Sequence, residues 1–489
     1  MLLRHGFAYL IARGLPGLVN FAALAVYTRL LAPADYGRYS LLVAGVSMAG
    51  VVVFQWHRLV LARWLSTRTQ DPQRFLGEIL RVFLVLALAV AGVGLGLAAV
   101  WPDPVWRRLL GLAVVLLIAQ EWVELNLILA AAQLSPARYG RMLGAKTMLA
   151  LAFGAALASI GLGAAAPMLG LIAGCALAVP LFGLAPWRGV RPAWPAPATV
   201  REQLRYGLPL VITFALGWII ASSDRLLIAW LLDVEAAGRY AVGYDLAQNS
   251  LGVLLAIAQV AAYPLAVRAL EERGQAAAQE QIRHNGELIL CLAISSAAGL
   301  AVLAPHIAAV AVGAEFRETT ARLLPWVALA AAIGGVKAFH LDIAFHLGRK
   351  SQGLLASAAI AAALNIALNL LLIPRFGLLG AAYATVLAYL SGGAASLWLG
   401  RRVFPMPPLA PLVLRGLAVG LAVAAGAWAG GGLAIAPTLG TLLAGITGAF
   451  IAAGVMALCL DVADARTALW SAQRKSRTMA ITFLRKVGH

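Results

Sequence analysis

Three arginines lie inside apolar stretches of this chain, at Arg13, Arg58 and Arg225. A charge within a membrane span is costly and usually marks a functional position. A guanidinium group can bind carboxylate or phosphate oxygens through two parallel hydrogen bonds, so these side chains predict contact with an anionic substrate. Two alternatives stay open: Arg13 can extend its head group to the interface, and Arg225 can form a structural ion pair with another helix.

Carboxylates in similar stretches predict ion coupling. Asp224 precedes Arg225, but adjacent residues on a helix point about 100° apart, so the two need not pair with each other. Asp245 shares a helix face with Asn249, and because a carboxylate facing lipid is disfavoured, this face is expected to point inward. Further candidates for coupling or pairing are Glu121, Glu124 and Glu287.

A second polar cluster, Lys337, His340, Asp342 and His346, falls within one later span. Lys337 and His340 are predicted to contact the substrate head group, and Asp342 to take part in ion coupling. Structural pairing among these residues is the alternative. A metal site is not predicted, because His340 and His346 are six residues apart and lie on different faces of a helix.

No catalytic motif accompanies these polar residues. The chain has neither a nucleophile elbow nor a phosphate-binding Walker loop, so neither catalytic residues nor a cofactor is predicted. Its three cysteines, Cys175, Cys291 and Cys459, lie in apolar runs. They are predicted to pack as small hydrophobic residues and not to form disulfides or a metal site.

The stretches that carry the polar residues are long enough to cross a bilayer. No Asp, Glu, Lys or Arg occurs between Gly416 and Leu460, and a span needs roughly 20 apolar residues, so this run predicts two spans with a turn near Pro437. Hydrophobic residues make up 62% of the 489-residue chain and charged residues 12%, which is typical of a membrane protein. Basic cytoplasmic loops account for the net charge of +18, and no nucleic-acid partner is predicted.

The hydropathy pattern predicts an all-α polytopic membrane protein with about 14 transmembrane helices. Lys and Arg are concentrated in every second loop, which places both termini in the cytoplasm and makes the number of spans even. The loops assigned to the outside are short. The predicted spans cover residues 7–31, 39–64, 80–101, 108–131, 142–162, 166–187, 206–232, 239–267, 286–312, 320–346, 353–373, 377–400, 411–431 and 437–459.

An internal repeat relates the two halves of the chain. The segments 30–39 and 231–240 share two leucines, a glycine, an arginine and a tyrosine at one offset of 201 residues. Such a repeat predicts two six-helix bundles with the same orientation, which is an architecture of transporters with a cavity between bundles. The predicted divisions are an N-terminal bundle over 1–187, a cytoplasmic linker over 188–205, a second bundle over 206–400, an extra helix pair over 411–459 and a basic cytoplasmic tail over 460–489.

Four motifs in this order resemble the oligosaccharide/polysaccharide flippase family of the multidrug/oligosaccharidyl-lipid/polysaccharide exporter superfamily. They are the segments 29–39, 224–244, 347–350 and 376–385, and the resemblance extends from residue 5 to about residue 400. It implies that an undecaprenyl-pyrophosphate-linked oligosaccharide is flipped across the bacterial inner membrane by alternating access, for surface polysaccharide or lipopolysaccharide biosynthesis. Many members of this family have twelve spans. The predicted helix pair over 411–459 departs from that number and resembles the lipid II flippases in this respect.

The partners expected on this basis are the lipid-linked oligosaccharide, membrane lipid, and a polysaccharide polymerase or glycosyltransferase; the protein is expected to be a monomer. Two alternatives remain. A multidrug or ion antiporter of the same superfamily would share the fold, but the surplus of intramembrane arginines favours an anionic substrate. An integral-membrane glycosyltransferase or polymerase commonly holds its catalytic residues in a long outer loop. Because the predicted outer loops of this chain are short, such an enzyme is disfavoured.

Overall fold

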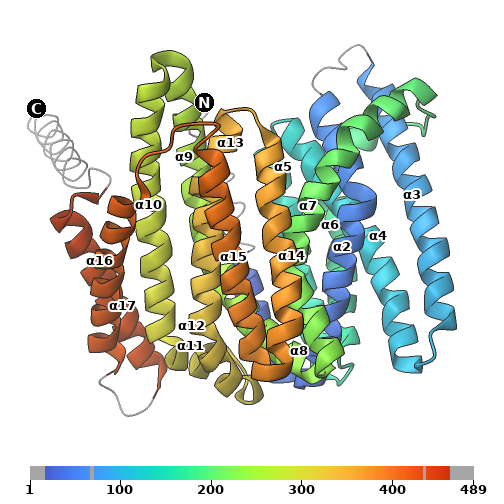
Figure 1. Ribbon diagram of the computed structural model, residues 1–489. Helices are drawn as coiled ribbons and strands as arrows, with labels where there is room; N and C mark the ends of the chain where they lie inside the picture. Colours follow the sequence, from blue (N-terminus) through green and yellow to red (C-terminus); the bar gives the residue numbers. More distant parts are fainter. Residues whose placement is uncertain (1–16, 66–70, 433–436, 463–489) are drawn as a thin grey trace, which may run out of the picture. The chain divides into compact units, whose positions relative to one another are not determined.

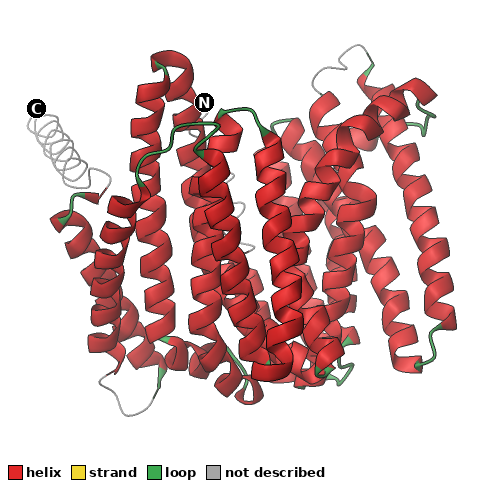
Figure 2. Ribbon diagram, in the orientation of Figure 1, coloured by secondary structure: helices red, strands yellow, loops and turns green. Residues whose placement is uncertain are grey.

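All regular structure in the described parts of the chain is helical (Figure 2). The computed structural model describes residues 17–65, 71–432 and 437–462. Thirteen helices within these ranges are long and apolar enough to cross a membrane, and a further apolar helix, Gly17–Leu30, begins where the described residues begin. The predicted all-α membrane fold with about 14 spans is therefore confirmed. Arg13 and the tail beyond residue 462 lie outside the described residues.

The helices follow one another with short connections (Figure 1). Two of the spans continue through a π-helical turn, Gln248–Gly252 between α8 and α9 and Lys337–Leu341 between α12 and α13. The helices after Gly17–Leu30 are α2 (Pro33–Trp64), α3 (Pro72–Val100), α4 (Pro104–Ala132), α5 (Pro136–Ser159), α6 (Ala165–Phe182), α7 (Pro197–Leu231), α8 (Val234–Ala247), α9 (Val253–Arg273), α10 (Gln275–Val302), α11 (Ala304–Ala311), α12 (Ala314–Val336), α13 (Ile343–Leu347), α14 (Ser351–Phe376), α15 (Leu378–Gly400), α16 (Leu409–Ala427) and α17 (Leu439–Cys459).

Local sequence explains where several helices begin. Helices α2, α3, α4, α5 and α7 each start with a proline, which is favoured at the first helical position because its missing N–H has no partner there. Asp103 caps α4 by accepting hydrogen bonds from the backbone N–H groups of Val105 and Trp106 at 2.6 and 3.0 Å. The start of α7 at Pro197 falls within the predicted linker 188–205. The segment before it is fixed to α3, because Ala193 N donates to the Gly77 carbonyl at 3.0 Å.

The chain forms two compact units that do not divide at a single point in the sequence. Unit 1 comprises Met1–Asn249, Ala311–Leu323 and Ala358–Ala388, and unit 2 comprises the remaining segments. Helices α12, α14 and α15 therefore contribute one part to each unit. The division into bundles over 1–187 and 206–400 stays a prediction.

Unit 1 has an aromatic and aliphatic core between α2, α3 and α4, which includes Phe54, Leu61, Phe75 and Leu116. Small residues bring other helices of this unit together. A Cβ at Gly170 of α6 would collide with the backbone of α5, so only glycine permits this approach.

Unit 2 carries the extra helix pair, in which α16 lies along α10 (Figure 1). Gly416 and Gly420 of α16 face Ile294 and Leu290 of α10 too closely to admit a Cβ without a shift. Glu287 of α10, which is 1% exposed, forms an ion pair with Arg415 of α16. Glycine packing and one half-buried ion pair thus hold α16 to α10, and Glu287 has a structural partner.

Candidate substrate and ion sites

Asp224 of α7 is a buried carboxylate held by neutral groups of unit 1. Its side chain is 1% exposed. Oδ2 accepts a hydrogen bond from Tyr240 Oη of α8 at 2.7 Å, and Oδ1 accepts from Asn369 Nδ2 of α14 at 2.7 Å. The Thr385 hydroxyl of α15 lies 2.6 Å from Oδ2. Four helices meet at this carboxylate, and within the described residues no cationic side chain pairs with it.

A second ring of neutral groups surrounds that carboxylate. Ser223 Oγ donates to Asn365 Oδ1 at 2.9 Å, and Asn365 Nδ2 lies 3.5 Å from Thr385 Oγ1. The Thr385 hydroxyl has one proton but two acceptors within reach, Asp224 Oδ2 and the Ala381 carbonyl at 2.9 Å. If that proton goes to the carbonyl, the short contact with Asp224 requires a proton on the carboxylate. The site can thus hold a protonated carboxyl, or a small cation among oxygen ligands.

Arg225 points away from this cluster, as the 100° angle between adjacent helical residues predicts. Its guanidinium forms an ion pair with Asp245 of α8 and lies 5.3 Å from the ring centre of Tyr244. Asp245 is 29% exposed and Arg225 12%. The alternative in which Arg225 forms a structural ion pair is therefore realised in this structure.

Arg58 of α2 also has a carboxylate neighbour. Its Nη1 lies 3.4 Å from Glu121 Oε2 of α4, and its Nη2 donates to Gln55. Arg58 Nε has no hydrogen-bond partner among the described residues. Glu121 is 3% exposed and leaves no room for a side chain at Gly50. On the neighbouring turn, Glu124 pairs with Lys146 of α5 at 3.1 Å, so charges of both signs alternate in this part of unit 1.

The predicted cluster of the later span lies in unit 2 on the π-helical turn Lys337–Leu341. Lys337 Nζ pairs with Asp342 Oδ2 at 2.8 Å, and Ser396 Oγ of α15 donates to Oδ1 at 2.6 Å. His340 is buried, and its ring fills the space that a side chain at Gly286 of α10 would need. A π-turn within a span often marks a functional position, because it redirects side chains from the regular helical faces.

An apolar cavity of about 690 Å³ lies beside this turn in unit 2. Helices α10, α12, α15 and α16 form its walls, and Val336 and Leu341, which flank the polar turn, are among the lining residues. Its other lining residues include Ala298, Leu329 and Leu397. We refer to it as the apolar groove.

The sequence of this chain matches a known family over more than half of its length. Residues 26–321 match the family described as "Polysaccharide biosynthesis protein". The chain belongs to this family. No curated protein matches the chain significantly.

Solved structures of transporters share the fold of this family member. The structure titled lipid II flippase MurJ in an inward closed conformation has a TM-score of 0.70 at 13% identity, over 92% of this chain and 99% of that chain. An inward-facing multidrug resistance MATE family transporter of the MOP superfamily has a TM-score of 0.63 at 12% identity, over 81% and 97%. A MOP superfamily transporter from Pyrococcus furiosus has a TM-score of 0.57 at 13% identity, over 82% and 94%. At these identities the likeness concerns the fold.

The charged residues of these sites were identified from the sequence of this chain, but the neutral residues that hydrogen-bond to them were not. Asn365, Asn369, Thr385 and Ser396 are uncharged and were not singled out. One signal was present, since Asn365 and Asn369 are four residues apart in an apolar span and share a helix face. A search for polar residues at helical spacing, and not only for charges, finds this pair.

Proposed function

We propose that this protein flips an undecaprenyl-pyrophosphate-linked oligosaccharide across the bacterial inner membrane by alternating access, for surface polysaccharide or lipopolysaccharide biosynthesis. Membership of the polysaccharide biosynthesis protein family supports a glycan substrate. The fold shared with a lipid II flippase and with multidrug transporters supports transport. Such a substrate has an apolar tail, a charged pyrophosphate and a polar glycan, so its carrier needs apolar and polar surfaces next to each other.

The observation that carries this proposal is the apolar groove next to a polar turn in unit 2. Val336 and Leu341 line the groove, and the turn between them bears Lys337 and His340. Lipid tails and apolar side chains are similarly apolar, so an apolar groove within the spans can hold part of the tail in place of the surrounding lipid. The head group then meets the polar turn.

A substitution that fills the groove tests the proposal. Ala298 lines the groove on α10, whereas Leu288 is an exposed residue of the same helix and does not line it. In proteoliposomes with a fluorescent lipid-linked oligosaccharide, we expect Ala298→Trp to reduce flipping by roughly tenfold or more, which corresponds to about 1.4 kcal/mol. Leu288→Trp should flip normally. Undiminished flipping by a well-folded Ala298→Trp protein, or transport of cationic drugs in place of the glycan lipid, would favour the multidrug antiporter.

For the pyrophosphate we propose Arg58 as the main contact, with Arg13, Arg225, Lys337 and His340 in support. The 3.4 Å separation between Arg58 Nη1 and Glu121 Oε2 is longer than a good charge-assisted hydrogen bond. Its Nε is unused among the described residues. In a state that opens this contact, a phosphate can take the place of Glu121, whose buried carboxylate must then be protonated or find another partner.

For ion coupling we propose Asp224. Unlike Asp245 and Asp342, it has no cation partner within the described ranges, so it can take up a proton or a small cation without displacing a charged side chain. Asp245 and Asp342 can contribute only in a state in which their pairs with Arg225 and Lys337 have opened.

The location and partners follow from the same proposal. We place both termini in the cytoplasm and the protein, as a monomer, in the inner membrane beside a polysaccharide polymerase or glycosyltransferase. The alternative that this chain itself transfers sugars is tested by incubating the purified protein with activated sugar and lipid acceptor. Sugar transfer by the isolated protein would contradict a purely transporting role.

A further inference from the structure

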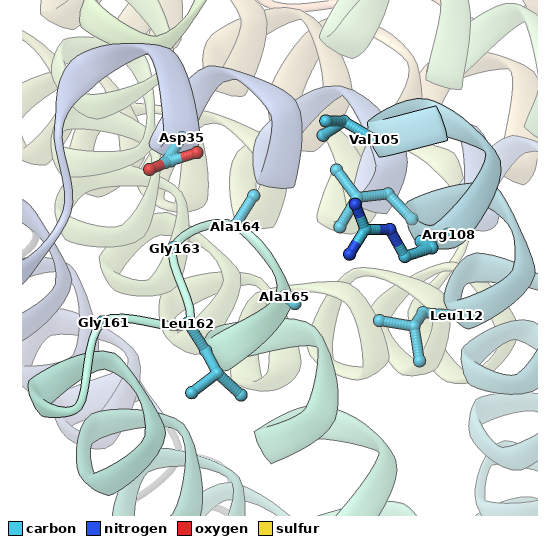
Figure 3. A pocket seen from close by; sticks show the side chains of 10 residues that line it. Asp35, Val105, Arg108, Leu112, Gly161, Leu162, Gly163, Ala164 and Ala165 are labelled. Carbon is cyan, nitrogen blue, oxygen red and sulfur yellow. The ribbon is translucent and has the colours of Figure 1, made fainter. Parts of the chain in front are cut away.

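A pocket of about 490 Å³ in unit 1 shares no residue with the sites above (Figure 3). It is formed where α2, α4 and α6 begin, at the end of the spans that the loop charges assign to the outside. Its lining residues are Asp35, Val105, Arg108, Leu109, Leu112, Gly161, Leu162, Gly163, Ala164 and Ala165. One cation and one anion are among them.

Arg108 extends its guanidinium into this pocket (Figure 3). Its Nε donates to the Pro104 carbonyl at 3.3 Å, and no carboxylate within the described residues pairs with it. The adjacent Arg107 differs, because its Nε and Nη2 both donate to the Trp101 carbonyl at 3.1 and 3.0 Å. Arg108 therefore presents free N–H groups in the fork geometry that suits phosphate. The first turn of α6, which begins at Ala165, also lines the pocket and adds positive potential.

Asp35 lies across the pocket from this guanidinium (Figure 3). Arg38 holds its Oδ1 at 2.8 Å, which fixes the carboxylate. Oδ2 faces the loop before α6, where a Cβ at Gly163 would lie 2.9 Å from it. Gly163 also has a φ of +53°, so both its conformation and its contact favour glycine. Asp35 and Arg108 thus share a cavity without pairing with each other, which is the arrangement that a zwitterionic ligand complements.

The remaining wall is apolar. Val105, Leu109 and Leu112 follow one another along one face of α4, from the end of the helix into the span. Leu162 adds an exposed apolar side chain from the loop. The ligand therefore has an apolar part next to its charges, at the level where a bilayer places its head groups.

We infer that this pocket binds a phospholipid with a phosphoethanolamine head group. Arg108 takes the phosphate, Asp35 takes the ammonium, and an acyl chain lies along Leu109 and Leu112. A choline head group has no N–H to donate to Asp35, and a phosphatidylglycerol head group has no cation for it. Preference for ethanolamine over both is thus the distinguishing property, and the inference stands apart from the proposed transport function.

The test is titration of the delipidated full-length protein in detergent with phosphatidylethanolamine, phosphatidylcholine, phosphatidylglycerol and water-soluble glycerophosphoethanolamine, followed by native mass spectrometry. Wild type should bind phosphatidylethanolamine roughly tenfold or more tightly than the other lipids, the scale of a lost hydrogen bond to a charged group. Arg108→Gln should lose this binding by roughly tenfold, whereas the control Arg107→Gln should keep it. Asp35→Asn should lose the preference over phosphatidylcholine. The control Glu235→Gln, which alters an exposed pair with Arg239 at the equivalent start of α8, should keep that preference.

Leu162→Trp fills the pocket without changing its charges, so it tests the site even if Arg108→Gln or Asp35→Asn fails to fold. It should weaken phosphatidylethanolamine binding to a similar extent. Equal affinity for the three lipids in wild type, or equal losses in the Arg107→Gln and Arg108→Gln proteins, would overturn the inference. Equal binding of glycerophosphoethanolamine would also overturn it, because the acyl chain would then have no role.

Discussion

Gly37 of α2 and Gly238 of α8 lie against each other, and they are counterparts in the internal repeat. A Cβ at Gly238 would lie 2.9 Å from Gly37 Cα and would collide with the Pro33 carbonyl, while a Cβ at Gly37 would collide with the Val234 carbonyl. The repeat therefore brings the first turns of its two helices into backbone contact within unit 1. Such a contact, made by equivalent residues of the two halves, is a natural point for a transporter to open and close.

Adding one methyl group at this contact should weaken it. We expect Gly238→Ala to cost about 1–3 kcal/mol of the closed arrangement, because the Pro33 backbone must move. Spin labels at Ala34 and Ala236 should then report longer distances and a larger open population than in the parent protein. Gly45→Ala is the matched control, since a Cβ at Gly45 of α2 meets nothing within 4 Å. Identical distance distributions in both variants would show that this contact does not control opening.

Removing the charge of Asp224 should uncouple transport from the ion gradient. Asp224→Asn keeps the shape of the side chain but cannot release a proton and lacks the negative charge that attracts a cation, so gradient-driven flipping should fall by at least tenfold. Thr385→Val should destabilise the protein by about 1–3 kcal/mol, because it leaves hydrogen-bonding groups of the cluster unpaired. Flipping measured against separate proton and sodium gradients identifies the ion. A gradient response equal to wild type in Asp224→Asn would exclude this carboxylate from coupling.

Substitutions at Arg225 and Asp245 should have coupled effects on stability, because the two side chains form an ion pair. Arg225→Ala leaves the partly buried Asp245 without its partner, so membrane abundance and thermal stability should fall. Combining it with Asp245→Ala should restore much of the loss, because the uncompensated charge is removed. Additive losses in the double mutant would show that the pair is not coupled, and Arg225 would then be better explained by substrate contact.

Substitution of Arg58 should reduce glycan export more than it reduces folding of the protein. Arg58→Ala is expected to abolish glycan export while the protein still reaches the membrane, and Arg58→Lys should restore export only in part because it lacks the bidentate fork. Export and membrane abundance are measured together in a deletion strain. If abundance falls instead, and Glu121→Gln restores it in the Arg58→Ala background, the pair with Glu121 is structural.

The proposed orientation is tested with reporter fusions. Fusions at Gly189, Arg273 and the C-terminus should report the cytoplasm, because the connections around these positions carry most of the Lys and Arg. A fusion at Pro104 should report the outside. An external C-terminus would contradict this orientation, and it would also move the pocket lined by Asp35 and Arg108 to the cytoplasmic side of the membrane.

Apolar run length and loop charge were sufficient to predict the spans, since both are local properties that each helix satisfies by itself. The Gly416–Leu460 run became α16 and α17, and the separation of Asp224 from Arg225 followed from helix geometry alone. The repeat of 30–39 at 231–240 was also visible in the sequence. Its consequence, the meeting of Gly37 with Gly238, was not.

Only the tertiary structure decided which polar groups meet. The pairs of Arg58 with Glu121 and of Arg225 with Asp245 join different helices, and Asn369 and Thr385 reach Asp224 from helices more than 140 residues away in sequence. Each partner depends on how far its helix is rotated and how closely it approaches its neighbours. Those quantities are set by packing between helices, through glycines such as Gly37, Gly170 and Gly416, and no single span contains that information.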